Sequence, residues 1–372
     1  MRTRRQDKKA TEASAAPRDE VASFTPTPLA SEDKFVASPS KPTTVVTISK
    51  VEDAVVARPD NAVTKSRSTS KIPTPIQFPL VAVLSFALSQ LGYSLAWPLT
   101  KGELTTHARL LNTWTEVGII ESWRLFELAL GWFGDFDGYD ITALNLLSHG
   151  PPLYLLFAHY NTPPFALLVT IVIETLATYI PFRLLRPLSR AHATPTAVPN
   201  ADILTDTPIA LLTTLLAGAI YSVTLLFAYA TYLPTYLISY FANLPSLARA
   251  HESSYVNLVP VTLVLGFAAR SFIFTPAEAT PRTAVDDRNE SFDPVKASLK
   301  DTVAWNFWGW SSQTKTAFGR TALLCLVTGL NTFLQTRLTV LGVETMGAIA
   351  WSAVWVGAGA VTGLALSAVG GV

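Results

Sequence analysis

Six long apolar runs constrain this chain more than any other feature of its sequence. A bilayer core about 30 Å thick is crossed by roughly 20 residues of α-helix, and every run is close to that length or exceeds it. Helices suit such runs because each backbone polar group must be satisfied where no water is present. The sequence therefore predicts an all-α fold, a polytopic transmembrane helical bundle. The six runs are 76–98, 163–182, 208–232, 255–274, 321–343 and 347–369.

Two further segments are ambiguous, so we expect between six and eight spans. Segment 119–134 is short and charged, and at about 100° per residue its charges fall on one side of a helix and its large apolar residues on the other. Such a helix lies in the membrane interface or spans with its polar face inward. Segment 141–160 is interrupted by the sequence Ser-His-Gly-Pro-Pro at 148–152, which predicts a broken span or a re-entrant piece.

The first 71 residues differ sharply from the rest. They hold 13 of the 28 Lys and Arg and 9 of the 27 Asp and Glu, but only two aromatic residues. Such a segment cannot bury enough apolar surface to offset its ordering entropy. We therefore predict a disordered tail over 1–71 and a transmembrane domain over 72–372.

Basic residues predict the topology. Lys and Arg accumulate in cytoplasmic loops, and they are abundant before residue 76, in 183–190 and in the 275–320 loop. These regions share one side of the membrane with six spans or eight, but not with seven, and we favour eight. Both termini and the 275–320 loop are then cytoplasmic. A net charge of +1 gives no argument for a nucleic-acid partner.

A set of charged residues within apolar surroundings forms the first candidate site. Glu174 lies in the middle of a run, and an intramembrane carboxylate suggests a function, although it could equally be a structural partner of an arginine. The charges of 119–134 could line a polar cavity with it, or simply pair along an interfacial helix. The candidate intramembrane site comprises Glu116, Glu121, Arg124, Glu127, Glu174 and Arg337.

Acidic residues in the Gly-Asp-Phe-Asp-Gly-Tyr-Asp stretch at 134–140 form a second candidate, a surface cluster of Asp135, Asp137 and Asp140 with His149. Carboxylates at this spacing can hold a divalent cation that carries a phosphorylated substrate. Gly and Asp are also what an ordinary solvated turn requires. The spacing fits neither an EF-hand nor a zinc site, and we predict no metal and no cofactor.

The last run carries small residues at a four-residue spacing. Gly359 and Gly363 form a small-x-x-x-small motif, which lets a second helix approach closely. The partner helix belongs to the same chain or to a second copy. The single cysteine, Cys325, excludes an intrachain disulfide.

One region resembles multi-pass membrane proteins of filamentous fungi that have no assigned activity. The similar stretches are Gly-Trp-Phe-Gly-Asp-Phe-Asp-Gly-Tyr-Asp at 131–140, Leu-Leu-Ser-His-Gly-Pro-Pro-Leu-Tyr at 146–154 and Tyr-Ile-Pro-Phe-Arg-Leu-Leu-Arg-Pro at 179–187. The resemblance implies a membrane protein and transfers no functional residue.

Three functions follow as hypotheses. The first is a non-enzymatic organising or interaction protein of the endomembrane system, such as the endoplasmic reticulum, which contacts the lipid bilayer and binds protein partners through its tail and the 275–320 loop. The second is a small-solute or proton-coupled transporter that uses Glu174 and the 116–127 charges. The third is a lipid-modifying enzyme that uses the aspartates at 135, 137 and 140. A wet cavity shared by Glu174 and Arg124 would favour transport, whereas aspartates converging with His149 would favour an enzyme.

Overall fold

The computed structural model describes residues 73–100, 108–242, 244–248, 252 and 254–370. The predicted tail over 1–71 lies outside these ranges. Six described helices are long and apolar enough to cross a membrane, and each matches one of the six apolar runs. They are α1 (Thr74–Thr100), α4 (Pro164–Leu185), α7 (Thr207–Ala230), the helix Tyr255–Glu278, α14 (Ser312–Thr339) and α15 (Thr345–Gly370).

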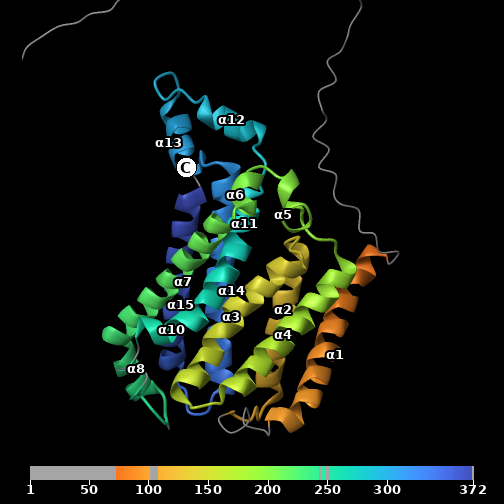
Figure 1. Ribbon diagram of the computed structural model, residues 1–372, viewed down its shortest axis with the longest axis vertical. Coiled ribbons are helices and arrows are strands. Elements are labelled where there is room, and N and C mark those ends of the chain that lie inside the picture. The colour runs from red at the N-terminus through yellow and green to blue at the C-terminus, as the bar shows by residue number, and fades with distance from the viewer. Residues whose placement is uncertain (1–72, 101–107, 243, 249–251, 253, 371–372) are drawn as a thin grey trace, which may run out of the picture. The chain divides into compact units, whose positions relative to one another are not determined.

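The two ambiguous segments are also long helices of the bundle. Helix α2 spans Trp114–Phe133 and α3 spans Gly138–His159. At about 1.5 Å per residue they measure roughly 30 Å and 33 Å, which matches a bilayer core. Figure 1 shows both running alongside α1, α4 and α14.

The six apolar helices together with α2 and α3 make eight long helices. Contacts between the segments that connect them place their ends in two groups. At one end, the α2–α3 turn contacts the segment after α4 through a hydrogen bond of 2.8 Å from the Ser189 amide to Asp137. At the other end, the Arg109 amide after α1 donates to Thr339 at the end of α14. Successive long helices therefore run in alternating directions, with α2 and α3 traversing the bundle like the others.

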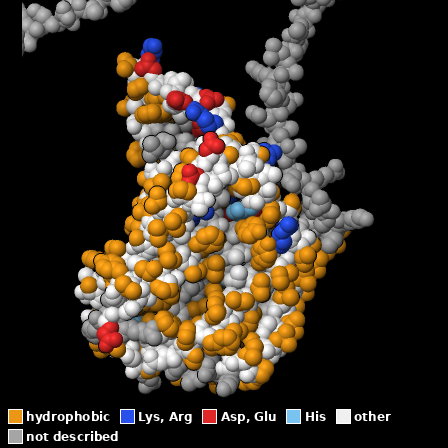
Figure 2. Space-filling model, in the orientation of Figure 1, with side chains coloured by type: hydrophobic (Ala, Val, Ile, Leu, Met, Phe, Trp, Pro, Cys, Tyr) orange, Lys and Arg blue, Asp and Glu red, His pale blue; other side chains and the backbone are white. Residues whose placement is uncertain are grey.

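One end of the bundle is rich in basic residues, and we name it the basic end. It holds the start of α1, the α2–α3 turn, the segment after α4, the segment between Glu278 and α14, and the end of α15. Figure 2 shows Lys and Arg side chains gathered toward this end on the face in view, whereas hydrophobic side chains cover the flank. Its described basic residues are Arg183, Arg186, Arg190, Arg282, Arg288, Lys296, Lys300, Lys315 and Arg320.

Helix α3 runs without a break through Pro151 and Pro152, so the predicted interruption at 148–152 is wrong. A proline in a helix leaves the carbonyl four residues earlier without its donor. Side chains of α14 replace both donors: Thr328 Oγ1 contacts the Leu147 carbonyl at 3.4 Å and Asn331 Nδ2 donates to the Ser148 carbonyl at 2.9 Å. The bundle thus supplies what the local sequence lacks.

A side chain of α14 also donates to a carbonyl that a proline leaves free in the helix Tyr255–Glu278. It begins as α10 (Tyr255–Ala269), loosens into a π-helical turn (Arg270–Phe274) and ends as α11 (Thr275–Glu278). Pro276 leaves the Phe272 carbonyl without its intrahelical donor, and Arg320 Nη1 on α14 donates to that oxygen at 2.9 Å.

Aromatic residues fill the centre of the bundle. Trp351 and Trp355 of α15 are 0% and 1% exposed. Tyr154 of α3 stacks on Trp351, with ring centroids 6.2 Å apart. The indole of Trp351 also donates to the Pro151 carbonyl at 3.2 Å, so α15 packs closely against the proline-containing part of α3.

Shorter helices connect the long ones and extend beyond the basic end. Helices α5 (Arg190–Ala193) and α6 (Ala201–Thr205), with a 3-10 turn at Pro195–Ala197, link α4 to α7, and α8 (Leu233–Tyr240) follows α7. Helices α12 (Ala284–Glu290) and α13 (Leu299–Trp308) precede α14 and project past the end of the bundle (Figure 1).

Candidate functional site

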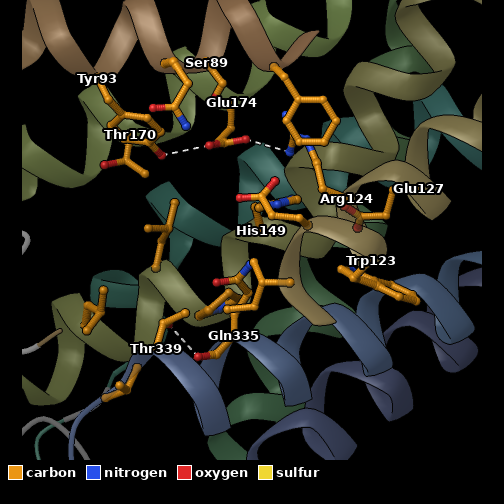
Figure 3. Close-up of a pocket in the computed structure, with 18 residues that line it drawn as sticks. Ser89, Tyr93, Trp123, Arg124, Glu127, His149, Thr170, Glu174, Gln335 and Thr339 are labelled. Carbon is orange, nitrogen blue, oxygen red and sulfur yellow. Dashed lines mark hydrogen bonds and ion pairs between the residues drawn. The ribbon is translucent and has the colours of Figure 1, made fainter. Parts of the chain in front are cut away.

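A polar cavity of about 250 Å³ lies among α1, α2, α3, α4 and α14. Its lining runs from the middle of the bundle toward the end opposite the basic end, where Thr339 and Val340 close α14. Figure 3 shows Glu174, Tyr93 and Thr170 on one side of this cavity, and Gln335 and Thr339 on the other. Glu121 lines it and is exposed to solvent.

Glu174 is bound by two other helices. Its Oε2 lies 2.6 Å from Nη1 of Arg124 on α2, and both side chains are 13% exposed. Its Oε1 accepts a hydrogen bond of 2.8 Å from the hydroxyl of Tyr93 on α1. Glu174 thus shares the cavity with Arg124, its ion-pair partner.

Two polar atoms at this pair, one on Arg124 and one on the nearby Glu127, lack partners in the described part of the chain. Glu127 lies one helical turn beyond Arg124, and its side chain is buried. Its Oε1 and Nη2 of Arg124 find no hydrogen-bond partner among the residues that the structure describes. A buried polar atom without a partner is costly, so a ligand, a water or a proton bound here would stabilise the bundle.

The remaining members of the predicted intramembrane site lie elsewhere. Glu116 pairs with Arg109 near the start of α2. Arg337 lies in the last turn of α14, where its Nε donates to Thr345 Oγ1 at 3.2 Å. The structure therefore brings together Glu121, Arg124, Glu127 and Glu174 and leaves Glu116 and Arg337 outside the cavity lining.

The aspartates after α2 do not form one surface cluster. Two of them, Asp137 and Asp140, are buried in ion pairs at the basic end, and we call this group the clamp. Asp137 and Asp140 are each 1% exposed. Asp135 is exposed, with φ of 57°. His149 lies nine residues beyond Asp140, about 13 Å further along α3, where it lines the cavity. The aspartates and His149 therefore do not converge.

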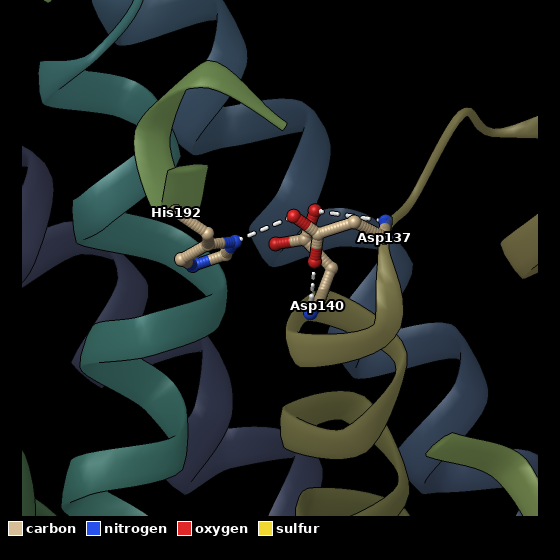
Figure 4. A group of neighbouring side chains, drawn as sticks. All are labelled: Asp137, Asp140 and His192. Atoms are coloured by element: carbon tan, nitrogen blue, oxygen red, sulfur yellow. Dashed lines mark hydrogen bonds and ion pairs between the residues drawn. The ribbon is translucent and has the colours of Figure 1, made fainter. Parts of the chain in front are cut away.

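Each buried aspartate already has partners, and Figure 4 shows the contact of Asp137 with His192. Asp137 caps α3 through the amides of Tyr139 and Asp140 and accepts from His192 Nδ1 at 2.7 Å. Asp140 binds Arg320 through both oxygens, at 2.7 Å and 3.1 Å. Burial raises the pKa of Asp137, but the hydrogen bonds from His192 and from the amides of Asp140 and Ser189 hold it well below its ordinary value.

Asp137, Asp140 and His192 bring potential ligand atoms within 4.8 Å of one another. A divalent cation there would have to displace Arg320 from Asp140 and His192 from Asp137, since both partners occupy the carboxylate oxygens that a metal needs. These contacts fit an ion-paired clamp of the α2–α3 turn better than they fit a metal site.

Arg186 strengthens this clamp. Its guanidinium donates to the Trp132 and Phe136 carbonyls at 2.6 Å and 3.1 Å, which caps the end of α2, and it lies 4.3 Å from the Trp132 ring. His192 and Arg320, which hold the two buried aspartates, were not among the predicted site residues. Both lie far from residues 137–140 in the sequence, and no local pattern signals their contact.

The glycine motif of α15 faces α14 of the same chain. A β-carbon at Gly363 would lie 2.1 Å from Oγ1 of Thr321, and one at Gly359 would lie 3.5 Å from Leu324. The motif is therefore occupied within the bundle.

Comparison with known families finds a match in the second half of the chain. The model of the Bouquet formation protein 3 C-terminal domain matches residues 206–369, which is less than half of the chain and runs from the start of α7 to the end of α15. No curated protein and no solved structure matches. The match leaves out α1–α4 and with them most of the cavity, and it does not include residues 131–187.

Proposed function

We propose that this integral membrane protein organises or recruits other proteins at the nuclear envelope or the connected endoplasmic reticulum. The similarity of residues 206–369 to Bouquet formation protein 3 supports this role. Both termini and α12–α13 then face the cytoplasmic or nuclear side, because the basic end collects the Lys and Arg residues. The role needs no catalytic group.

Helix α13 has an exposed apolar side, and this feature gives the proposal its main structural support. Leu299, Val303 and Phe307 recur every four residues and therefore share one side of the helix. Leu299 is 82% exposed and Phe307 is 67% exposed. The opposite side is anchored, because Trp305 stacks on Phe292 and donates to the Asn289 carbonyl at 2.9 Å.

We infer that this apolar side lies outside the hydrocarbon of the bilayer. Lys315 lies in the first turn of α14, and a charged side chain favours the edge of the bilayer over its hydrocarbon core. Helix α13 extends beyond this end of α14 (Figure 1). Exposed apolar side chains of this kind indicate a binding surface, so we infer that a protein partner covers Leu299, Val303 and Phe307.

Site-specific photocrosslinking in native membranes tests this role. A benzoylphenylalanine at position 307 is expected to yield a discrete protein adduct, and the same probe at Asp287, an exposed position on α12, is not. Triple substitution of Leu299, Val303 and Phe307 by Ser should leave the thermal stability unchanged, since these side chains are exposed, and should remove the function that depends on the partner. Adducts with lipid alone, or equal adducts at both positions, would contradict the proposal.

A second candidate, small-solute or proton-coupled transport, is supported by the cavity that Glu174 shares with Arg124. Purified protein in liposomes that contain a pH-sensitive dye would test it. A flux that Glu174→Gln abolishes is expected for a transporter, and no flux above that of empty liposomes would exclude the proton-coupled form. Lipid modification receives no support from the aspartates, which Arg320 and His192 already occupy.

A further inference from the structure

The charges that line the cavity do not balance. Three carboxylates, those of Glu121, Glu127 and Glu174, face it with a single guanidinium, that of Arg124. Glu174 already neutralises Arg124 at 2.6 Å. Glu121 has no cationic partner among the described residues. Glu127 is buried without one, which favours its neutral form, so the excess negative charge in the cavity is that of Glu121. Because Glu121 is exposed, solvent screens its attraction for a cation.

Aromatic rings line the same space. Phe86 and Tyr93 come from α1 and Trp123 comes from α2. Rings of this kind attract an organic ammonium ion through their electron-rich faces. Small inorganic ions are bound instead by cages of oxygen atoms, and a cavity of about 250 Å³ leaves them far from most of its walls.

Hydrogen-bonding groups complete the lining and can bind the polar part of a ligand. The amides of Gln90 and Gln335 and the hydroxyls of Thr170 and Thr339 all border the cavity. A volume of about 250 Å³ is smaller than most drug-sized pockets, so a single small molecule fits and a whole lipid does not.

We propose that this cavity is a binding site for a small organic ammonium ion, which enters past Glu121 from the end of the bundle opposite the basic end. The ammonium group is attracted by the carboxylate of Glu121 and surrounded by Phe86, Tyr93 and Trp123. Arg124 acts indirectly, because its ion pair holds Glu174 in the cavity wall. Such binding depends neither on the organising role nor on transport.

Isothermal titration of the purified full-length chain in detergent tests the site, with choline and ethanolamine as probes and sodium and potassium chloride at equal ionic strength as references. We expect saturable binding of an ammonium probe to one site per chain. Glu121→Gln should weaken binding about fivefold, the effect of one solvent-screened charge nearby. Phe86→Leu should weaken it roughly 2- to 30-fold through the lost ring face.

Glu344→Gln is the matched control, since Glu344 is exposed near the same end of the bundle but does not line the cavity. It removes the same charge and should leave the affinity unchanged. Glu121 is exposed, so its variant is expected to fold, and thermal unfolding of each variant checks this. No saturable binding of either ammonium probe would overturn the proposal. So would equal binding of potassium, or an affinity that Glu121→Gln and Glu344→Gln change alike.

Discussion

At the scale of single residues, two buried ion pairs link helices that are distant in the sequence. Arg124 and Glu174 join α2 to α4 in the middle of the bundle. Arg320 and Asp140 join α14 to α3 at the basic end. A charge buried in an apolar environment is tolerated when it is paired and hydrogen-bonded, so these pairs determine which helices are neighbours.

Removing one partner of the central pair should be more damaging than removing both. Arg124→Met leaves the carboxylate of Glu174 buried without its cation, and we expect a loss of about 3–5 kcal/mol in the free energy of unfolding. Replacing Glu174 by Met as well should recover much of that loss. Thermal unfolding in detergent measures both variants, and a double variant no more stable than Arg124→Met would show that the pair is not what holds α2 against α4.

Asp137 should make stability depend on pH in the acid range. Its pKa in the folded protein lies below the unfolded value of about 3.9. Its contribution is therefore fully present above that value and is lost as the pH falls through the folded pKa. Asp137→Asn should cost about 2 kcal/mol at pH 7, and the difference from wild type should shrink below pH 4. Asp135→Asn, at a side chain that is 85% exposed, is the control and should change stability at neither pH.

At the scale of helices, hydrogen bonds donated by a neighbouring helix explain why α3 is continuous, which its local sequence does not predict. The apolar runs identified the six most apolar helices because hydrophobicity over about 20 residues is a property of the run itself. The continuity of α3 through its two prolines could not be predicted in this way. It depends on Thr328 and Asn331, which lie almost two hundred residues further along the chain.

The donor that Asn331 supplies to α3 can be tested by a rescue. Asn331→Leu leaves the Ser148 carbonyl without a donor and should destabilise the protein by about 1–3 kcal/mol. Adding Pro152→Ala restores a backbone N–H four residues after Ser148, and part of the stability should return. The rescue is incomplete because Asn331 also accepts from Trp123 Nε1 at 3.1 Å. Thermal unfolding of the single and double variants decides the matter, and an Asn331→Leu variant as stable as wild type would refute this explanation.

The contact between α14 and α15 should be sensitive to side-chain size at one glycine. A side chain at Gly363 meets Thr321 at 2.1 Å, whereas one at Gly357 meets nothing within 4 Å. Gly363→Leu should therefore lower the unfolding temperature or prevent folding, and Gly357→Leu on the same helix should not. Equal effects of the two substitutions would indicate that α14 and α15 do not pack closely here.

In the molecule as a whole, the two roles that we propose belong to different regions. The region 206–369, which is similar to the Bouquet formation protein 3 C-terminal domain, contains α12–α13 and the tightly packed α14–α15 pair. The rest of the chain supplies most of the polar cavity. Sequence reasoning found Glu121, Arg124, Glu127 and Glu174 because charge within apolar sequence is conspicuous. It missed Tyr93, Gln335 and the aromatic lining, since such residues acquire meaning only when distant helices meet.

We infer that α2 and α3 cross the membrane and thereby bring Arg124 to Glu174 within the bilayer. Labelling of single cysteines with a membrane-impermeant maleimide, in a Cys325→Ala background, tests this topology. Asp135→Cys reports the α2–α3 turn and Asn161→Cys the α3–α4 turn, with Lys296→Cys and Leu341→Cys as references for the basic end and the opposite end.

In sealed vesicles of known orientation, Asp135→Cys is expected to react from the same side as Lys296→Cys, and Asn161→Cys from the side of Leu341→Cys. If Asp135→Cys and Asn161→Cys instead react from the same side, α3 does not cross the membrane. The bundle, its cavity and the intramembrane ion pair would then all be contradicted.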